Sequence, residues 1–284
     1  MPYRDLVGLR VLVTGASQGI GRAIAVEAAR RGCKVLASAR SQPLLDELAA
    51  EVRAAGHSLE TIVADVTKPE DRQAMADAAQ ARFGGLDVLI NNAGIGATGH
   101  FVDTTEETLR TIFETNYFGL TELIRVCLPL LKQGRKPSIV NIGSVVGRRA
   151  LPARCLYSSS KFAVAGFSEA IREELAKDGI QVQVVSPGLT QTNFSKNMLE
   201  AKAKLSMDHQ RGMTSEEVAV ATMKAIEKGK NETTLTLKGK MLLLVSKFAP
   251  FVVDFFAKKK VRELFADEIA ERERKRKDEG VKVG

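Results

Sequence analysis

The 284-residue sequence has little of what several protein classes require. It contains no tryptophan, three cysteines and three histidines. Cys33, Cys127 and Cys155 are too few and too scattered for a disulfide framework or a zinc cluster, and the histidines have no metal-ligand spacing. These absences exclude a disulfide-stapled secreted scaffold, and we expect no metal site. A reducing intracellular compartment is the default for such a chain, so we expect a cytoplasmic protein.

Long apolar runs are also missing. No apolar stretch of the signal-peptide type follows Met1. The most apolar segment, residues 241–257, contains Lys247, Pro250 and Asp254. A membrane-spanning helix needs about 20 mostly apolar residues. The sequence therefore predicts neither a secretory signal nor a transmembrane helix.

The composition is otherwise that of a globular protein with a full core, since 44% of the residues are hydrophobic and 27% are charged. The formal net charge of +8 is distributed unevenly. Residues 1–194 carry 22 basic and 20 acidic side chains, whereas residues 195–284 carry 20 and 14. The basic excess lies in the last third of the chain, where we expect any contact with acidic partners.

Short apolar runs alternate with helical patterns from residue 10 to about residue 190. The expected strands are 10–14, 34–39, 60–64, 86–91, 138–144 and 181–186, and the expected helices are 19–31, 43–55, 69–83, 105–131 and 155–177. This alternation predicts right-handed βαβ units and a mostly parallel sheet covered on both faces. We therefore predict a doubly wound, Rossmann-like α/β fold. A single catalytic domain spans residues 1–235, and a helical C-terminal extension follows at 236–284.

The pattern changes after residue 188. Residues 189–213 are polar and small without a clear period, and they predict a long substrate loop. A helix is expected at 215–228 and a last strand at 232–237. In the amphipathic segment 241–257, Pro250 should produce two short helices or one kinked helix.

A glycine-rich turn connects the first strand to the first helix. Its glycines allow the backbone to approach a pyrophosphate, and the helix N-terminus supplies N–H groups and a positive dipole end. The Gly-x₃-Gly-x-Gly spacing differs from the commoner Gly-x-Gly-x-x-Gly, and a glycine-rich connecting loop is the alternative interpretation. The residues predicted to bind a dinucleotide are Gly15, Ser17, Gln18, Gly19, Ile20 and Gly21.

The end of the second strand predicts which dinucleotide binds. A carboxylate there would bind the ribose 2′-hydroxyl of NAD, whereas an arginine accommodates the 2′-phosphate of NADP. The residues at this position are Arg40 and Ser41, and no acidic residue lies beside them. We therefore predict NADP, with NAD less favoured. A solvated surface role for Arg40 is the alternative.

Four further segments complete a pattern. Asn91-Asn92-Ala93-Gly94 follows the fourth strand, Asn116 lies in the long helix, Ser144 ends the fifth strand, and Tyr157 and Lys161 begin the next helix. With the glycine turn, these segments over residues 8–235 resemble the classical short-chain dehydrogenase/reductase family, and in particular its hydroxysteroid-dehydrogenase-like members. The resemblance implies an oxidoreductase that transfers hydride between a nicotinamide cofactor and a carbonyl or alcohol. It also implies a homodimer or homotetramer assembled through helices 105–131 and 155–177.

The chemistry of these residues is coherent. Tyr157 and Lys161 are neighbours on one helical face. A free tyrosine has a pKa of about 10. We expect the adjacent ammonium and the positive nicotinamide ring of the oxidised cofactor to lower the pKa of Tyr157, so that it serves as proton donor or acceptor. Ser144 is expected to hold the substrate oxygen. The resemblance implies that Lys161 also binds the nicotinamide ribose and that Asn116 holds a water of a proton relay.

The resemblance assigns further cofactor contacts. The adenine would be contacted by Asp65 and Val66. The cofactor beside the fourth strand would be lined by Asn92, Ala93 and Gly94. The nicotinamide amide would be contacted by Pro187, Gly188 and Thr192.

The C-terminal extension has three interpretations. In the first, it covers the pocket and packs on a neighbouring subunit. In the second, residues 236–260 lie in a membrane interface, with their lysines on anionic headgroups. Nucleic-acid binding is disfavoured, because the tail mixes charges of both signs and has no known motif. An apolar lid suits a lipophilic ketone such as a steroid, a retinoid or a long-chain lipid. The alternative function is a membrane-surface or nucleotide-sensing binding protein on the same scaffold.

Overall fold

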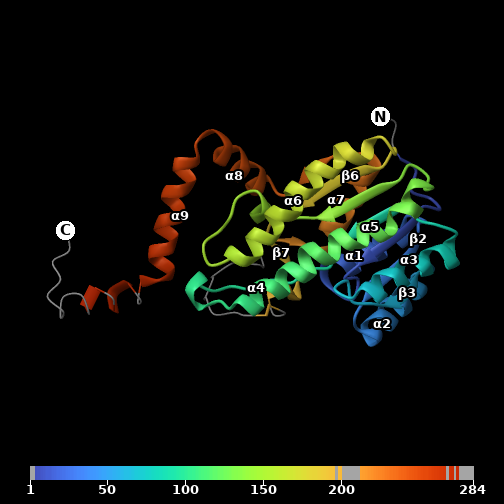
Figure 1. The fold of residues 1–284 in the computed structure, drawn as a ribbon, viewed down its shortest axis with the longest axis horizontal. Coiled ribbons are helices and arrows are strands. Elements are labelled where there is room, and N and C mark those ends of the chain that lie inside the picture. Colours follow the sequence, from blue (N-terminus) through green and yellow to red (C-terminus); the bar gives the residue numbers. More distant parts are fainter. Residues whose placement is uncertain (1–3, 196–197, 200–211, 267–268, 272, 275–284) are drawn as a thin grey trace.

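A computed structural model describes residues 4–195, 198–199, 212–266, 269–271 and 273–274. Seven parallel strands form one sheet in the order β3-β2-β1-β4-β5-β6-β9 (Figure 1). The strands are β1 Arg10–Thr14, β2 Lys34–Ala39, β3 Glu60–Val63, β4 Val88–Asn91, β5 Ser138–Ile142, β6 Gln181–Ser186 and β9 Glu232–Thr234. The reversal of strand order between β1 and β4 is the point at which doubly wound folds bind their ligands.

Helices cover both faces of this sheet, as expected for strands that are apolar throughout. One hydrophobic cluster joins the sheet to α1 (Gly19–Arg30), α2 (Gln42–Ala54) and α7 (Ser215–Lys228). A second cluster joins the other face to α3 (Pro69–Phe83), α5 (Gly119–Lys132) and α6 (Cys155–Ala176). The predicted doubly wound, Rossmann-like α/β fold is therefore confirmed.

The helix expected at 105–131 is interrupted. It begins as α4 (Glu106–Phe113), where the Thr105 hydroxyl accepts a hydrogen bond from the backbone N–H of Thr108. It then passes through a π-helical turn at Glu114–Phe118 before continuing as α5. A π-turn inserts one extra residue and rotates the side chains that follow. It places Asn116, which is fully buried, toward the sheet.

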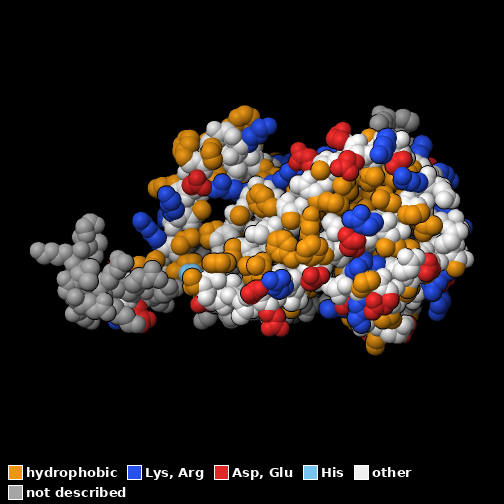
Figure 2. Space-filling model, in the orientation of Figure 1, with side chains coloured by type: hydrophobic (Ala, Val, Ile, Leu, Met, Phe, Trp, Pro, Cys, Tyr) orange, Lys and Arg blue, Asp and Glu red, His pale blue; other side chains and the backbone are white. Residues whose placement is uncertain are grey.

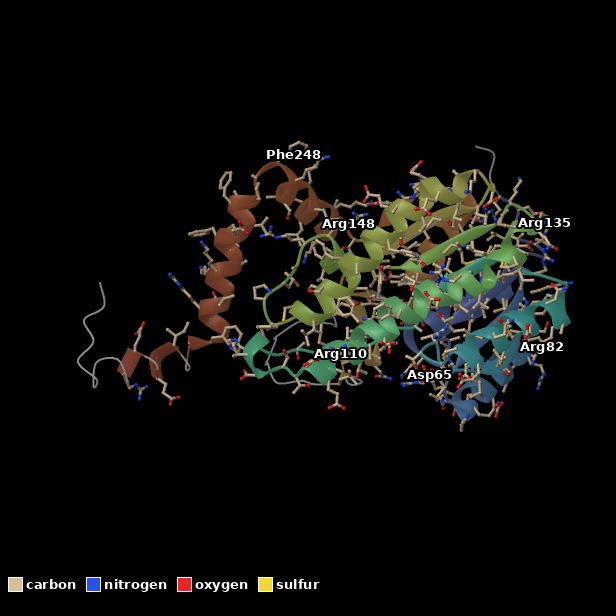
Figure 3. The ribbon with its side chains drawn as sticks, viewed as in Figure 1. Asp65, Arg82, Arg110, Arg135, Arg148 and Phe248 are labelled. Carbon is tan, nitrogen blue, oxygen red and sulfur yellow. The ribbon has the colours of Figure 1, made fainter. Side chains whose placement is uncertain are left out.

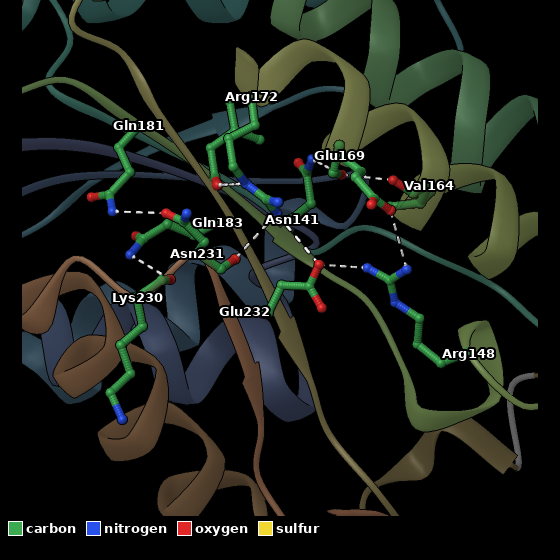
Figure 4. A network of polar contacts seen from close by, with 12 residues as sticks. Asn141, Arg148, Val164, Glu169, Arg172, Gln181, Gln183, Lys230, Asn231 and Glu232 are labelled. Carbon is green, nitrogen blue, oxygen red and sulfur yellow. Dashed lines mark hydrogen bonds and ion pairs between the residues drawn. The ribbon is translucent and has the colours of Figure 1, made fainter. Parts of the chain in front are cut away.

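The strand expected at 232–237 is shorter than predicted. It ends at Thr234, because the Thr236 hydroxyl caps helix α8 (Leu237–Phe248) by accepting a hydrogen bond from the backbone N–H of Gly239. Side chains from two other segments secure this edge strand (Figure 4). Arg148 binds the Glu232 carboxylate at 2.6 Å, and Arg172 lies 3.6 Å from it.

The C-terminal extension stands away from the sheet (Figure 1). As predicted, Pro250 separates two helices, α8 and α9 (Pro250–Leu264). Asp254 of α9 pairs with Arg149, and the rings of Phe265 and His100 lie in contact. None of the described helices is long and apolar enough to cross a bilayer.

Much of the loop predicted at 189–213 falls outside the described residues. Its described ends pair as two short parallel strands, β7 (Thr190–Gln191) and β8 (Met213–Thr214). A 3₁₀ turn, Asn193–Ser195, follows β7. These elements place the start of the loop beside the carboxyl end of β6.

Candidate active site

A cavity of about 710 Å³ lies at the carboxyl ends of the central strands. Its walls come from the segments that follow β1, β2, β3, β4, β5 and β6 and from the start of α6. All of the predicted site residues line it except Gly21 and Asn116, which pack behind the wall. Motifs separated by as many as 170 residues in the sequence therefore meet in one site, because parallel strands end at the same edge.

The glycine turn has a backbone that other residues do not readily adopt. Gly15 and Gly19 have φ angles of 64° and 57°, in the left-handed region. The Asn92 side chain donates hydrogen bonds to the carbonyl oxygens of Thr14 and Gly15, at 2.9 and 3.2 Å. The turn is thus fixed from the side of β4.

The same turn fits a phosphate group. A methyl group at Gly21 would lie 2.3 Å from both Asn92 Nδ2 and Gly15 O, so only glycine allows the helix to start this close to the turn. No side chain caps the N-terminus of α1. The helix N-terminus therefore lies open to the cavity, as an anion site requires.

Arg40 and Asp65 lie at the adenosine end of the cavity. The Arg40 side chain is 74% exposed, and its Nη1 lies 3.9 Å from an Asp65 carboxylate oxygen. Asp65 is held in place, since its Oδ1 accepts hydrogen bonds from the backbone and hydroxyl of Thr67 at 2.9 and 2.8 Å. Figure 3 marks Asp65 at this edge of the sheet. Within the described part of the chain the guanidinium has no closer ion pair, and it is accessible to a ligand.

Ser144, Tyr157 and Lys161 line the opposite end of the cavity. Lys161 is 5% exposed, its Nζ donates a 2.8 Å hydrogen bond to the carbonyl oxygen of Ile142, and it lies 5.9 Å from the centre of the Tyr157 ring. Burial lowers the pKa of Lys161 to about 8. The lysine therefore exchanges protons close to neutral pH.

The pKa of Tyr157 differs from the expectation. Burial raises it above the ordinary value, while the charge of Arg154 and the Ser144 hydroxyl act in the opposite direction. The expected lowering refers to the complex with the oxidised cofactor; in the protein alone, desolvation of the phenolate outweighs nearby positive charge and the pKa is raised. Sequence reasoning missed Arg154, although it lies only three residues before the tyrosine, at the position that immediately precedes α6.

Asn116 lies beneath the cavity. Its Oδ1 accepts a hydrogen bond from the backbone N–H of Ile95 at 2.8 Å, and its Nδ2 donates to Ile95 O and to Ser160 Oγ, both at 2.9 Å. A methyl group at Gly94 would come 3.3 Å from Asn116 Oδ1 and 3.7 Å from Lys161 Nζ. The amide thus braces the segment between β4 and the catalytic helix.

Apolar side chains surround the end of the cavity beside Tyr157. They belong to Ile95, Leu189, Phe194 and Met198. The Phe194 ring lies 5.4 Å from the Tyr157 ring, centre to centre. Among the described residues, no cluster of three or more His, Cys, Asp or Glu side chains is placed to hold a metal ion.

A dinucleotide-type turn, a half-buried serine and tyrosine and a buried lysine at the switch point of a doubly wound sheet define a nicotinamide-dependent oxidoreductase. Comparison with known proteins agrees. Residues 10–203 match the family model described as short chain dehydrogenase. The chain belongs to this family of oxidoreductases, which act on alcohol and keto groups.

Several relatives are similar over most of their length. Ketoacyl reductase HetN of Nostoc sp. is 35% identical over 260 residues, which cover 88% of each chain. Dehydrogenase/reductase SDR family member 7B of Mus musculus is 34% identical, over 80% of this chain and 72% of its own. A short chain dehydrogenase/reductase from Burkholderia phymatum, solved in complex with NAD, is 25% identical with a TM-score of 0.80, covering 88% of this chain and 96% of its own.

A second solved structure carries a different cofactor. An alcohol dehydrogenase from the archaeon Thermococcus sibiricus, complexed with 5-hydroxy-NADP, is 27% identical with a TM-score of 0.70 and covers 79% of this chain and 94% of its own. The neighbours thus bind either NAD or NADP nucleotides.

Proposed function

We propose that this protein is an NADP(H)-dependent reductase or dehydrogenase that interconverts a lipophilic ketone and the corresponding secondary alcohol. The observation that carries the proposal is the meeting of Ser144, Tyr157 and Lys161 in one cavity with the glycine turn. The bound nicotinamide supplies or accepts the hydride. Ser144 orients the carbonyl oxygen, and Tyr157 gives that oxygen a proton or removes it. Lys161, buried beside the ring, connects the tyrosine to the proton pool.

Tyr157→Phe tests this function. NADPH oxidation is measured at 340 nm with a panel of steroid, retinoid and long-chain ketones for both the natural protein and the variant. General acid–base catalysis contributes roughly 100- to 10,000-fold, so the variant should lose at least 100-fold in kcat. Equal rates in the two proteins would contradict the catalytic role and favour the alternative, a nucleotide-sensing binding protein.

Arg40 supports NADP as the cofactor. It follows β2, where the adenosine ribose of a dinucleotide is expected, and its side chain is exposed rather than committed to a close ion pair. A planar guanidinium binds a phosphate through two parallel hydrogen bonds. Asp65 and Val66 remain the proposed adenine contacts.

The apolar lining supports a lipophilic substrate. Leu189, Phe194 and Met198 offer the surface on which an aliphatic or ring system would pack beside Tyr157. Turnover of small hydrophilic ketones only, with no activity on lipophilic ones, would contradict this substrate class.

A homodimer or homotetramer is the proposed assembly, formed through α4–α5 and α6. Hydrophobic side chains gather over these helices in Figure 2. Phe118 of the π-turn and Phe162 of α6 are 47% and 43% exposed. A second copy of the chain would bury them. Phe162→Glu should therefore reduce the molar mass measured by light scattering, whereas an unchanged mass would exclude this interface.

Residues 236–260 are proposed to rest on an anionic membrane surface. Leu237, Phe248 and Phe251 are each more than 70% exposed, and Phe248 lies at the bend between α8 and α9 (Figure 3). From residue 237 to residue 262 the only acidic side chain is Asp254, which is paired with Arg149. The remaining charges of this segment are basic, so they complement anionic headgroups at about 1 kcal/mol for each lysine near the surface.

Vesicle co-sedimentation tests the membrane contact. The protein should pellet with phosphatidylcholine vesicles that contain phosphatidylserine and bind less to phosphatidylcholine alone. Lys258→Glu with Lys259→Glu should abolish the difference. Lys34→Glu with Arg53→Glu, which changes the net charge equally at exposed sites on β2 and α2, is the matched control. Equal binding by the two double variants would contradict the proposal.

A further inference from the structure

The substrate end of the cavity contains a buried arginine without an acidic partner in the described part of the chain. Arg154 directly precedes α6, is 8% exposed, and has a buried Nε that no acceptor reaches. It lines the cavity together with Tyr157, Phe194 and Met198. The guanidinium therefore faces the space in which the substrate is proposed to bind.

Two other arginines of low exposure have acidic partners, whereas Arg72, whose buried Nε also lacks an acceptor, donates to the carbonyl oxygen of Val66 at 2.8 Å. Arg10 binds Asp87 at 2.6 Å through Nη2, and Arg31 binds Glu27 at 2.6 Å through Nε. Arg154 departs from this arrangement. Among the described residues that line the cavity, the only acidic one is Asp65, which lies at the other end beside Arg40.

The position of Arg154 is unfavourable for a cation. Burial of an unpaired charge costs several kcal/mol, and a helix N-terminus carries partial positive charge. The preceding residue adds strain, because Ala153 adopts a left-handed φ of 60°. A 3.0 Å hydrogen bond from the backbone N–H of Gly99 to the carbonyl oxygen of Ala153 holds this conformation. A buried unpaired charge and a strained backbone are retained where the binding of a ligand offsets their unfavourable free energy.

We propose that Arg154 binds a carboxylate of the substrate, so that the natural substrate is an oxo acid rather than a neutral ketone. This inference rests on the proposed carbonyl reduction at Tyr157. A guanidinium fork matches a carboxylate through two parallel hydrogen bonds. Arg154 immediately precedes the helix that carries Tyr157, and its charge acts on the Tyr157 phenol, so we place the carboxylate a few bonds from the reacting carbonyl. The rest of the substrate is apolar and packs on Leu189, Phe194 and Met198.

A carboxylate at this position also suits the proton donor. The positive charge of Arg154 lowers the pKa of Tyr157, although burial leaves that pKa above its ordinary value. A bound carboxylate offsets the charge of Arg154. The phenol then keeps its proton, which is the form that reduces a carbonyl.

Turnover of matched substrates tests the inference. The probes are medium-chain 2-oxo, 4-oxo and 6-oxo acids, each compared with its own methyl ester. The natural protein should prefer acids with the shorter separations. Arg154→Gln should lose about 10- to 100-fold in kcat/KM for the acids, mainly through KM, because hydrogen bonds to charged groups are worth about 1.5–3 kcal/mol. The esters should lose clearly less than the acids, so that the preference for acid over ester falls, and Arg154→Lys should retain part of the preference.

Two results of the turnover experiment would overturn the inference. One is equal turnover of acid and ester by the natural protein. The other is an equal loss for both in Arg154→Gln, which would give Arg154 a role only in the local structure or in the protonation of Tyr157. A melting temperature no lower than that of the natural protein and an unchanged NADPH affinity establish that the variant is folded.

A binding measurement separates this inference from the proposed function. Decanoate, which cannot be reduced, is titrated calorimetrically into the protein with NADPH present, and decanol and decyl phosphate serve as comparisons. Decanoate should bind the natural protein at least tenfold more tightly than Arg154→Gln, even if no carbonyl compound is turned over. Equal binding to both proteins, or a preference for the alkyl phosphate over the carboxylate, would overturn the carboxylate assignment.

Discussion

Asn116 holds Ile95 by both hydrogen-bonding groups of the Ile95 backbone. The amide oxygen accepts from the Ile95 N–H at 2.8 Å, and the amide nitrogen donates to the Ile95 carbonyl at 2.9 Å. This pairing connects the π-turn to the segment after β4, which lines the cavity. The second proton of the amide reaches Ser160, next to Lys161 on α6.

Asn116→Leu should destabilise the protein and reduce its activity. Leucine is similar in size but leaves the N–H and C=O of Ile95 without partners, and each unsatisfied buried group costs about 1–3 kcal/mol. We expect the free energy of unfolding, measured by urea denaturation, to fall by about 2–4 kcal/mol. Ser160→Ala removes one of the three amide contacts and should cost no more than about 1.5 kcal/mol. A loss in Asn116→Leu no larger than that in Ser160→Ala would contradict the bracing role.

Arg40→Ala should weaken NADPH binding without weakening NADH binding. Loss of a guanidinium–phosphate contact is worth about 1.5–3 kcal/mol, so the Kd for NADPH should rise about 10- to 100-fold. Quenching of nucleotide fluorescence measures both constants. Arg53→Ala, which removes the same charge from the exposed last turn of α2, is the control. If the ratio of the NADPH and NADH affinities stays constant in Arg40→Ala, another group binds the 2′-phosphate.

Gly21→Ala should disrupt the glycine turn. The added methyl group would lie 2.3 Å from Asn92 Nδ2 and from Gly15 O, so the helix start or Asn92 must move. Overpacking of this kind costs about 1–3 kcal/mol, and displacement of the turn should weaken NADPH binding by more than tenfold. Gly166→Ala, in an exposed part of α6 with no heavy atom within 4 Å of the new methyl group, should leave NADPH affinity unchanged. Normal affinity in Gly21→Ala would show that the turn tolerates a side chain.

The buried Lys161 should make stability rise with pH in the alkaline range. Its pKa is about 8 in the folded protein, compared with about 10.5 in the unfolded chain. Between these values the unfolded chain binds a proton that the folded protein does not, so the free energy of unfolding increases with pH. Below pH 8 both states are protonated, and the full cost of burying the charge is present.

Lys161→Met isolates this contribution. The difference in unfolding free energy between the natural protein and the variant should move in favour of the natural protein between pH 7 and pH 9.5, by about 1–2 kcal/mol. Urea denaturation at several pH values measures it. A difference that does not change with pH would mean that Lys161 titrates normally. The range stops below pH 10 because the ionisation of tyrosine begins there.

The sequence by itself determined the fold class and the membership of the site. Apolar runs such as Val11–Val13 and Val88–Ile90 can only be strands buried on both sides, and their alternation with helices leaves one topology class. The motif residues follow successive strands, and parallel strands end at one edge. Their meeting in a single cavity therefore follows from order along the chain.

The tertiary structure decided what depends on packing between distant segments. The π-turn at Asn116 and its pairing with Ile95 have no periodic signal in the sequence. The raised pKa of Tyr157 results from burial by several elements. The i,i+4 spacing in the sequence indicates only that Lys161 is its neighbour. Arg154 is an ordinary arginine in the sequence. Only its burial next to Tyr157, with no carboxylate partner in the described part of the chain, makes it informative, because the cost of a buried charge depends on everything that surrounds it.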